Sequence, residues 1–220
     1  MAYEHEIWEA AHRAEAGVHN AMSAYSDGTF SEEPAITGGL VMALRDAIRG
    51  DSEIAAGNLV WSAHILRSSR GVAAEESIYG ADILFHVIFD APDLRYSKGL
   101  LVQAKRVEPE QEMTTAAHAD LVDQCNKMLS RTSAAYIFDY ARSGMRCGSA
   151  MAIQGSSDRH LYRQCAWTPF RFFWELFRCF VGDSHIVSAD PADLPIPNIL
   201  QLIASDRVRE PITERARLSE

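Results

Sequence analysis

An acid, an amide and an ammonium group recur at a spacing that a β-hairpin would bring together. Asp82 opens one apolar run, and Gln103 and Lys105 close the next run 21 residues later. Alternate residues of a strand face the same side of a sheet, so Gln103 and Lys105 should project together while Val102 and Ala104 face the core. If the two runs pair as a hairpin, the acid lies at the same end as the amide and the ammonium.

These three groups suit metal-assisted chemistry on a phosphate. A carboxylate and a carbonyl-type oxygen are ligands for Mg²⁺ or Mn²⁺, and such ions keep several waters and need few protein ligands. A lysine beside the ion can orient or deprotonate a water and stabilise the charge that develops on a phosphate. The alternative is a surface hairpin with ordinary polar residues, because an acid followed by Gln-x-Lys is a short pattern.

The apolar periodicity predicts the elements that must hold these residues. Helices are expected over 4–24, from Ser31–Pro34 to Gly50, over 115–130 and over Phe170–Val181, with a short one near Asn198–Ala204. Strands are expected over Leu59–Arg67, Ile83–Phe89, Leu100–Val107, Ala134–Tyr140 and Gly148–Ile153. The turn Ala91-Pro92-Asp93 joins the second and third strands as a hairpin. The layout predicts an α/β fold with a mixed sheet between helices.

The order of these elements and motifs resembles the PD-(D/E)xK nuclease superfamily, with its restriction-endonuclease-like fold. A helix with Glu33 comes first, followed by a strand, Gly80-Ala81-Asp82, Leu101-Val102-Gln103-Ala104-Lys105 and a further helix. The chain is most similar to the Mrr-like branch, in which Gln replaces the acid of the second motif. The resemblance covers residues 30–155, and Ala81 stands where the family often has Pro.

The resemblance implies a role for each motif residue. Asp82 matches the central metal ligand, Gln103 the second ligand, and the backbone carbonyl of Ala104 a further ligand. Lys105 matches the catalytic lysine. The helical acid of the family falls on Glu33. The sequence leaves Glu32 and Glu76 open as alternatives for this additional acidic ligand.

The activity implied by the resemblance is that of a Mg²⁺-dependent endonuclease that hydrolyses phosphodiester bonds in double-stranded DNA, with Mn²⁺ able to substitute. A restriction or antiphage-defence role is implied by resemblance only. A cut in both strands needs two active sites, so a homodimer or larger homo-oligomer is expected. Two alternatives stay open: a catalytically silent subunit that binds nucleic acid or protein, and a nuclease that acts on RNA. Because the sequence has no familiar DNA-reading motif, the expected specificity is either low or supplied by a partner protein, which could also supply activation.

The charge distribution permits a nucleic-acid substrate despite a formal net charge of −9. Residues 1–60 carry 10 acidic against 3 basic side chains, whereas residues 124–180 carry 8 basic against 3 acidic ones, with aromatic residues between them. Basic residues near the motifs are candidates for phosphate contacts, namely Arg67, Arg70, Arg106, Lys127 and Arg131. Gln124, on the helix after the lysine strand, is a further candidate for the phosphate path.

Length and composition predict one nuclease domain over residues 1–206, followed by a charged tail at 207–220. Its core is expected over about 30–155, with helical additions at 1–29 and 156–206. The four cysteines have no Cys-x-x-Cys spacing and are expected to be buried apolar residues rather than disulfides or zinc ligands. The sequence shows no signal peptide, and no apolar run reaches the ~18 residues of a membrane span, so a cytoplasmic protein without membrane contact is expected.

Overall fold

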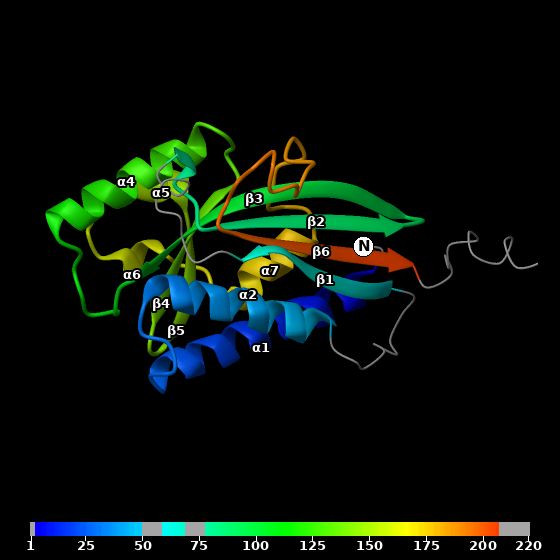
Figure 1. Cartoon of the computed structure of the whole chain (residues 1–220), viewed down its shortest axis with the longest axis horizontal. Coiled ribbons are helices and arrows are strands. Elements are labelled where there is room, and N and C mark those ends of the chain that lie inside the picture. Colours follow the sequence, from blue (N-terminus) through cyan, green and yellow to red (C-terminus); the bar gives the residue numbers. More distant parts are fainter. Residues whose placement is uncertain (1–2, 50–58, 69–77, 207–220) are drawn as a thin grey trace, which may run out of the picture.

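Six strands form one mixed sheet, in the order β1-β6-β2-β3-β4-β5. The computed structural model describes residues 3–49, 59–68 and 78–206 (Figure 1). The strands are β1 Leu59–Ser68, β2 Ile83–Ala91, β3 Leu94–Arg106, β4 Ala135–Ala141, β5 Gly144–Ser149 and β6 Asn198–Asp206. The helices are α1 Glu4–Ser26, α2 Glu33–Arg49, α4 Thr115–Leu129, α5 Ala150–Gln154, α6 Leu161–Gln164 and α7 Pro169–Phe177. The α/β class with a mixed sheet between helices is therefore confirmed.

The sheet has a helical layer on each face, and two separate apolar clusters fill the space between the layers. Helices α1, α2 and α7 pack on one face, with side chains such as Leu40, Phe85 and Phe173 in a shared cluster. Helices α4 and α5 pack on the other face, over a cluster that includes Leu101 and Leu121. Figure 1 shows α1 and α2 on one side of the strands and α4 on the other.

The predicted hairpin is confirmed, and it is longer than the sequence pattern indicated. Strands β2 and β3 pair antiparallel from Ile83↔Val102 to Ala91↔Leu94, which leaves only Pro92 and Asp93 in the turn. Strand β4 then pairs parallel with β3, as a crossover through α4 requires. The turn lies at one end of the sheet, and the start of β2 and the end of β3 lie at the other (Figure 1).

The short helix expected near Asn198–Ala204 is wrong. This segment is strand β6, which lies between β1 and β2 and pairs parallel with β2 and antiparallel with β1. Most of its residues are buried because a central strand is covered on both faces. Such a strand is a continuous apolar run, and its periodicity does not separate it from a buried helix. The region expected to be a helical addition, 156–206, thus supplies a central strand.

Three smaller expectations also need correction. Strand β5 spans Gly144–Ser149, and the residues after it form α5 instead of continuing the strand to Ile153. Helix α7 ends at Phe177, before the left-handed φ of 70° at Cys179. Cys179 is exposed, whereas the other three cysteines are buried as expected. Among the described helices, none has the length and apolar character needed to cross a bilayer.

Candidate metal-binding site

Asp82 lies beside the end of β3, where the hairpin register predicts it. Its backbone N–H donates to Val102 O over 2.8 Å, which extends the ladder one residue beyond the start of β2. Asp82 Oδ2 accepts hydrogen bonds from Gln103 Nε2 at 2.6 Å and from the backbone N–H of Ala104 at 2.8 Å. The acid and the amide, 21 residues apart in sequence, are therefore in direct contact.

The Gln103 amide lies between two oxygens that the resemblance assigns to a metal. Its Nε2 donates to Asp82 Oδ2 and, at 3.0 Å, to the backbone oxygen of Ala104. Its Oε1 is buried and has no hydrogen-bond partner among the described residues. An unpaired buried acceptor costs about 1–3 kcal/mol, and in native proteins such an atom is commonly satisfied by a bound ion or water. A carboxylate, an amide oxygen and a carbonyl oxygen are ligand types of a hard divalent cation, but here the amide turns its Nε2, and not its Oε1, toward the other two oxygens.

Lys105 and Glu33 form the second pair of the site. Lys105 Nζ lies 3.5 Å from Glu33 Oε1, and both side chains are partly buried. Glu33 is the first residue of α2, where a negative charge is stabilised by the helix dipole. Thr37 Oγ1 donates to the Glu33 backbone oxygen one turn further on. Of the three acids that the sequence left open, Glu33 thus contacts the lysine, Glu32 is exposed, and Glu76 lies outside the described residues.

Tyr140, a buried tyrosine of β4, contacts Thr37 on the helix that carries Glu33. The hydroxyl of Tyr140 lies 3.3 Å from Thr37 Oγ1 and is fully buried. Burial raises the pKa of Tyr140 well above its usual value, and the negative charges of Asp82 and Glu33 raise it further. The Thr37 hydrogen bond opposes this shift in pKa.

Asp139 is a buried acid that the sequence analysis did not select. It pairs with Lys105 across the parallel ladder and is 1% exposed. Burial raises the pKa of Asp139 to about 7, the Val107 N–H at 3.2 Å opposes this shift, and the charges of Glu108 and Glu33 add to it. Its Oδ2 has no hydrogen-bond partner within the described chain. The sequence feature that could have identified Asp139 is an acidic residue within an otherwise apolar predicted strand.

Asn198, the first residue of β6, holds the backbone of Asp82. Its backbone N–H and its Nδ2 both donate to Asp82 O, at 3.1 and 3.0 Å. Ser68 Oγ, at the end of β1, donates to Asn198 Oδ1 at 3.4 Å. This residue was missed because its strand was expected to be a helix. The fixed carbonyl aims the Asp82 side chain at β3.

Helix α4 packs closely on the segment that leads into Asp82. Gly80 has φ +67°, and a Cβ there would lie 2.5 Å from Gln124 O, so the close approach requires glycine. Gln124 Oε1 is buried without a hydrogen-bond partner among the described residues, as is Gln103 Oε1. The structure thus brings Gln124 to the motif, while its expected contact with phosphate remains a prediction.

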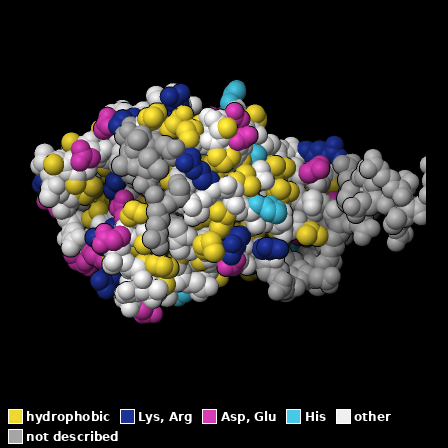
Figure 2. Space-filling model, viewed as in Figure 1, with side chains coloured by type: hydrophobic (Ala, Val, Ile, Leu, Met, Phe, Trp, Pro, Cys, Tyr) yellow, Lys and Arg dark blue, Asp and Glu magenta, His cyan; other side chains and the backbone are white. Residues whose placement is uncertain are grey.

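Of the basic residues expected at the phosphate path, Lys127 and Arg106 contact other groups of the chain. Lys127 pairs with Asp123 one turn earlier on α4, and Arg106 donates to Ser31 O. Arg67 lies on β1, and Arg70 falls outside the described residues. On the face shown in Figure 2, Lys and Arg side chains of the described chain lie among Asp and Glu side chains.

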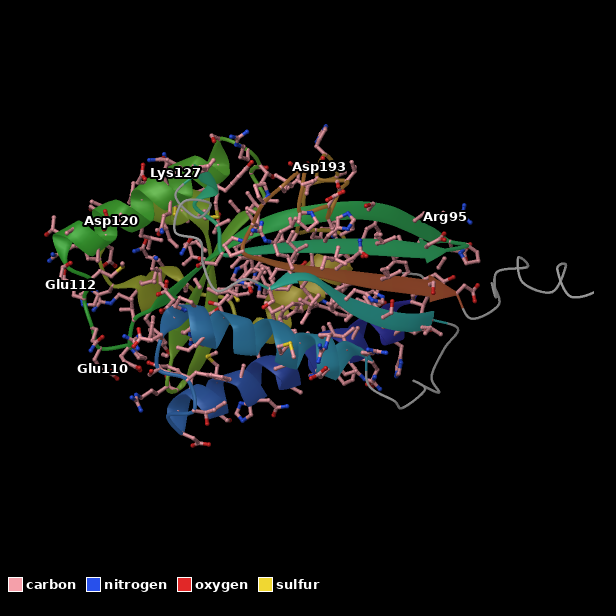
Figure 3. The ribbon with its side chains drawn as sticks, in the orientation of Figure 1. Arg95, Glu110, Glu112, Asp120, Lys127 and Asp193 are labelled. Atoms are coloured by element: carbon pink, nitrogen blue, oxygen red, sulfur yellow. The ribbon has the colours of Figure 1, made fainter. Side chains whose placement is uncertain are left out.

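Exposed acids lie on the N-terminal half of α4 and on the loop before it, and one of them, Glu112, pairs with Arg159 at 2.7 Å. Asp120 on α4, and Glu110 and Glu112 on the loop before it, all project outward (Figure 3). Arg131, just beyond the end of α4, is exposed, and its guanidinium lies 5.3 Å from the centre of the Tyr79 ring. Arg131 therefore follows the C-terminal end of α4, whereas Glu110 and Glu112 precede its N-terminal end.

The donor set is unusual in having few carboxylates. The described part of the chain holds no group of three or more His, Cys, Asp and Glu side chains arranged to bind a metal ion. A cation would therefore depend on the Asp82 carboxylate, the Gln103 amide and the Ala104 carbonyl, with Glu33 nearby. Comparison of the chain with protein-family models, with characterised proteins and with solved structures finds no match.

Proposed function

We propose that this protein is a Mg²⁺-dependent endonuclease related to the PD-(D/E)xK superfamily, and that it hydrolyses phosphodiester bonds in double-stranded DNA. The observation that carries the proposal is the pair of contacts at the end of β3. Asp82 is bonded to Gln103 and Ala104, and two residues further on Lys105 pairs with Glu33. The same strand end therefore presents oxygen ligands and an ammonium group side by side.

Each residue of the candidate site has a distinct role in the proposed reaction. Asp82 and the Ala104 carbonyl would hold the cation, together with the Gln103 amide oxygen once the amide turns it, in place of its Nε2, toward them. Bound there, a hard divalent cation would supply Lewis-acid stabilisation of the negative charge on the phosphate. Lys105 orients the attacking water and stabilises charge that develops on the phosphoryl oxygens. Glu33 keeps the ammonium in place.

The order of elements also supports the relation to this superfamily. An acid-bearing helix, a strand, the motif hairpin, a helix and a parallel strand follow one another along the chain, as the resemblance implies. Strand β6, inserted between β1 and β2, was not part of that expectation. We further propose that the enzyme acts in the cytoplasm as a homodimer or larger homo-oligomer, with a partner protein that supplies specificity or activation.

A substrate panel tests the reaction class. The purified chain is incubated with supercoiled DNA, single-stranded DNA and RNA, each with Mg²⁺, with Mn²⁺ and with EDTA. We expect strand breaks in the duplex DNA with either metal and none with EDTA. Breaks confined to RNA would assign the site to an RNA nuclease instead. Metal-independent breaks, or none with any substrate, would contradict the proposed function.

A further inference from the structure

A cavity opens on the same face of β3 as the candidate site. Its volume is about 240 Å³. Its lining residues are Leu101, Arg131, His185, Ile186, Val187, Ser188 and Leu194. In Figure 1 the orange segment that leads into β6 crosses β3 and β2 beside the end of α4. The cavity thus lies between this segment and the end of α4, and no expected function has used it.

The wall formed by the 183–188 segment is firmly attached to the sheet. Asp183 and Gly99 exchange two backbone hydrogen bonds, at 2.8 and 3.0 Å, and Thr132 Oγ1 donates to Asp183 Oδ2 at 2.7 Å. A Cβ on Gly99 would lie 2.3 Å from Ile186 Cγ2, so the glycine lets Ile186 press against the strand. These contacts join the segment to both β3 and the turn before β4, and the cavity is therefore preformed.

The cavity combines an apolar interior with the Arg131 guanidinium at its mouth. Leu101 is 1% exposed and Ile186 and Leu194 are partly buried, so they offer apolar contact area. His185 and Arg131 are exposed at the mouth. Nucleobases are bound on such surfaces, by apolar contact with the ring faces and by stacking on aromatic or guanidinium planes. The Arg131 guanidinium, which already lies over the Tyr79 ring, provides one such plane.

Two stretches of chain connect the cavity to the candidate metal site. Leu101 and Gln103 are alternate residues on one face of β3, about 7 Å apart along the strand. Tyr79 precedes Asp82 by three residues. A nucleotide whose phosphate lies at Asp82 and Gln103 can therefore reach the cavity with a neighbouring base.

We propose that this cavity binds one unpaired nucleobase of the substrate strand, next to the phosphate that is cleaved. The inference rests on the proposed nuclease function and refines its substrate class. A base inside a duplex is stacked and paired, so a base that enters the cavity has been flipped out or belongs to a single-stranded region. The substrate would then be DNA with a distorted or locally unpaired site.

Binding without cleavage tests this proposal. A short single-stranded oligonucleotide that contains 2-aminopurine is titrated with the protein in EDTA, and both affinity and 2-aminopurine fluorescence are recorded. Arg131→Ala removes the stacking plane, and Leu194→Trp fills the cavity while leaving Arg131 in place. Because base stacking is worth about 1–3 kcal/mol, each change should weaken binding about tenfold and remove the fluorescence change. Arg171→Ala is the matched control, since Arg171 is also exposed and lies over a ring, that of Trp167.

The outcomes separate this inference from the nuclease proposal. If both cavity variants bind like the wild type, or if Arg171→Ala weakens binding as much as they do, the cavity is not a base site. This holds even where the wild type cleaves DNA. If Arg131→Ala alone weakens binding, Arg131 contacts phosphate and the base site is also excluded. If the cavity variants behave as expected but no Mg²⁺-dependent cleavage occurs, the nucleobase site stands and the nuclease proposal fails. Circular dichroism of Leu194→Trp confirms that it folds, and Arg131→Ala changes only a surface side chain.

Discussion

The side-chain amide of Gln103 determines how much negative charge the candidate site carries. It is a neutral group, and its NH₂ donates to Asp82 Oδ2 at 2.6 Å. The buried pair therefore carries one negative charge where two carboxylates would carry two. This arrangement keeps the site stable without a cation, because two acids at that distance would repel each other.

Gln103→Glu should make the stability of the protein depend on the metal. The variant loses the donor to Asp82 and places two carboxylates in contact, so in EDTA it should be destabilised by about 1–3 kcal/mol. For a chain of this size each kcal/mol corresponds to about 2–4 °C in Tm. Mg²⁺ should restore most of the stability that Gln103→Glu loses. Gln103→Ala adds no charge, so Mg²⁺ should stabilise it much less. Thermal melts with and without Mg²⁺ measure the difference, and equal Mg²⁺ effects in the two variants would exclude a cation between these side chains.

Asp139→Asn should change the pH dependence of stability. The folded pKa of about 7 lies above the usual 3.8, so between these pH values the folded state keeps a proton that the unfolded state releases. Wild-type stability should therefore fall as pH rises from 4 to 7, by up to about 4 kcal/mol. Asn does not titrate, so the stability of the variant relative to the wild type should increase as the pH rises from 4 to 7. Urea unfolding at a series of pH values measures this, and parallel curves would show that Asp139 titrates normally.

At the scale of elements, local patterning predicted the hairpin correctly and β6 incorrectly. The turn at Pro92-Asp93 and the apolar runs beside it define β2 and β3 without reference to the rest of the chain. Strand β6 forms because β1 and β2 pair with both its edges. These strands are distant in sequence, so the local pattern of residues 198–206 does not reveal the pairing. The location of Asp82, Gln103 and Lys105 at one end of the hairpin could therefore be predicted. Asn198 could not, because its role follows from the position of β6 beside Asp82.

Helix α7 offers a test of the packing on the other face of the sheet. Phe173 is completely buried and packs on Phe85, whereas Trp174 is only partly buried and stacks on Phe170. Phe173→Ala should destabilise the protein by about 3–5 kcal/mol, the typical cost of truncating a buried aromatic residue. Trp174→Ala should cost clearly less. Urea unfolding of the two variants measures both values, and an equal or larger loss for Trp174→Ala would place Trp174 in a contact outside the single chain.

At the scale of the whole molecule, the candidate site and the proposed base cavity lie on the face of β3 that α4 covers. The described part of the chain presents this site once, so a double-strand break requires two copies. Light scattering should give a mass of twice 24.4 kDa or a higher multiple, with or without DNA. A monomer of 24.4 kDa that converts supercoiled plasmid directly to the linear form would contradict the proposed assembly.

Mg²⁺-dependent nicking of supercoiled plasmid by wild type, Asp82→Ala and Asp90→Ala tests the central claim most directly. Asp90 is an exposed acid near the far end of β2, where it pairs with Arg95, so its loss controls for a general change in charge. The wild type and Asp90→Ala should convert the plasmid at similar rates. Asp82→Ala should lose at least the ~10²–10³-fold that removal of a group at the reacting centre typically costs. Cleavage by Asp82→Ala at the wild-type rate would show that the end of β3 is not the active site.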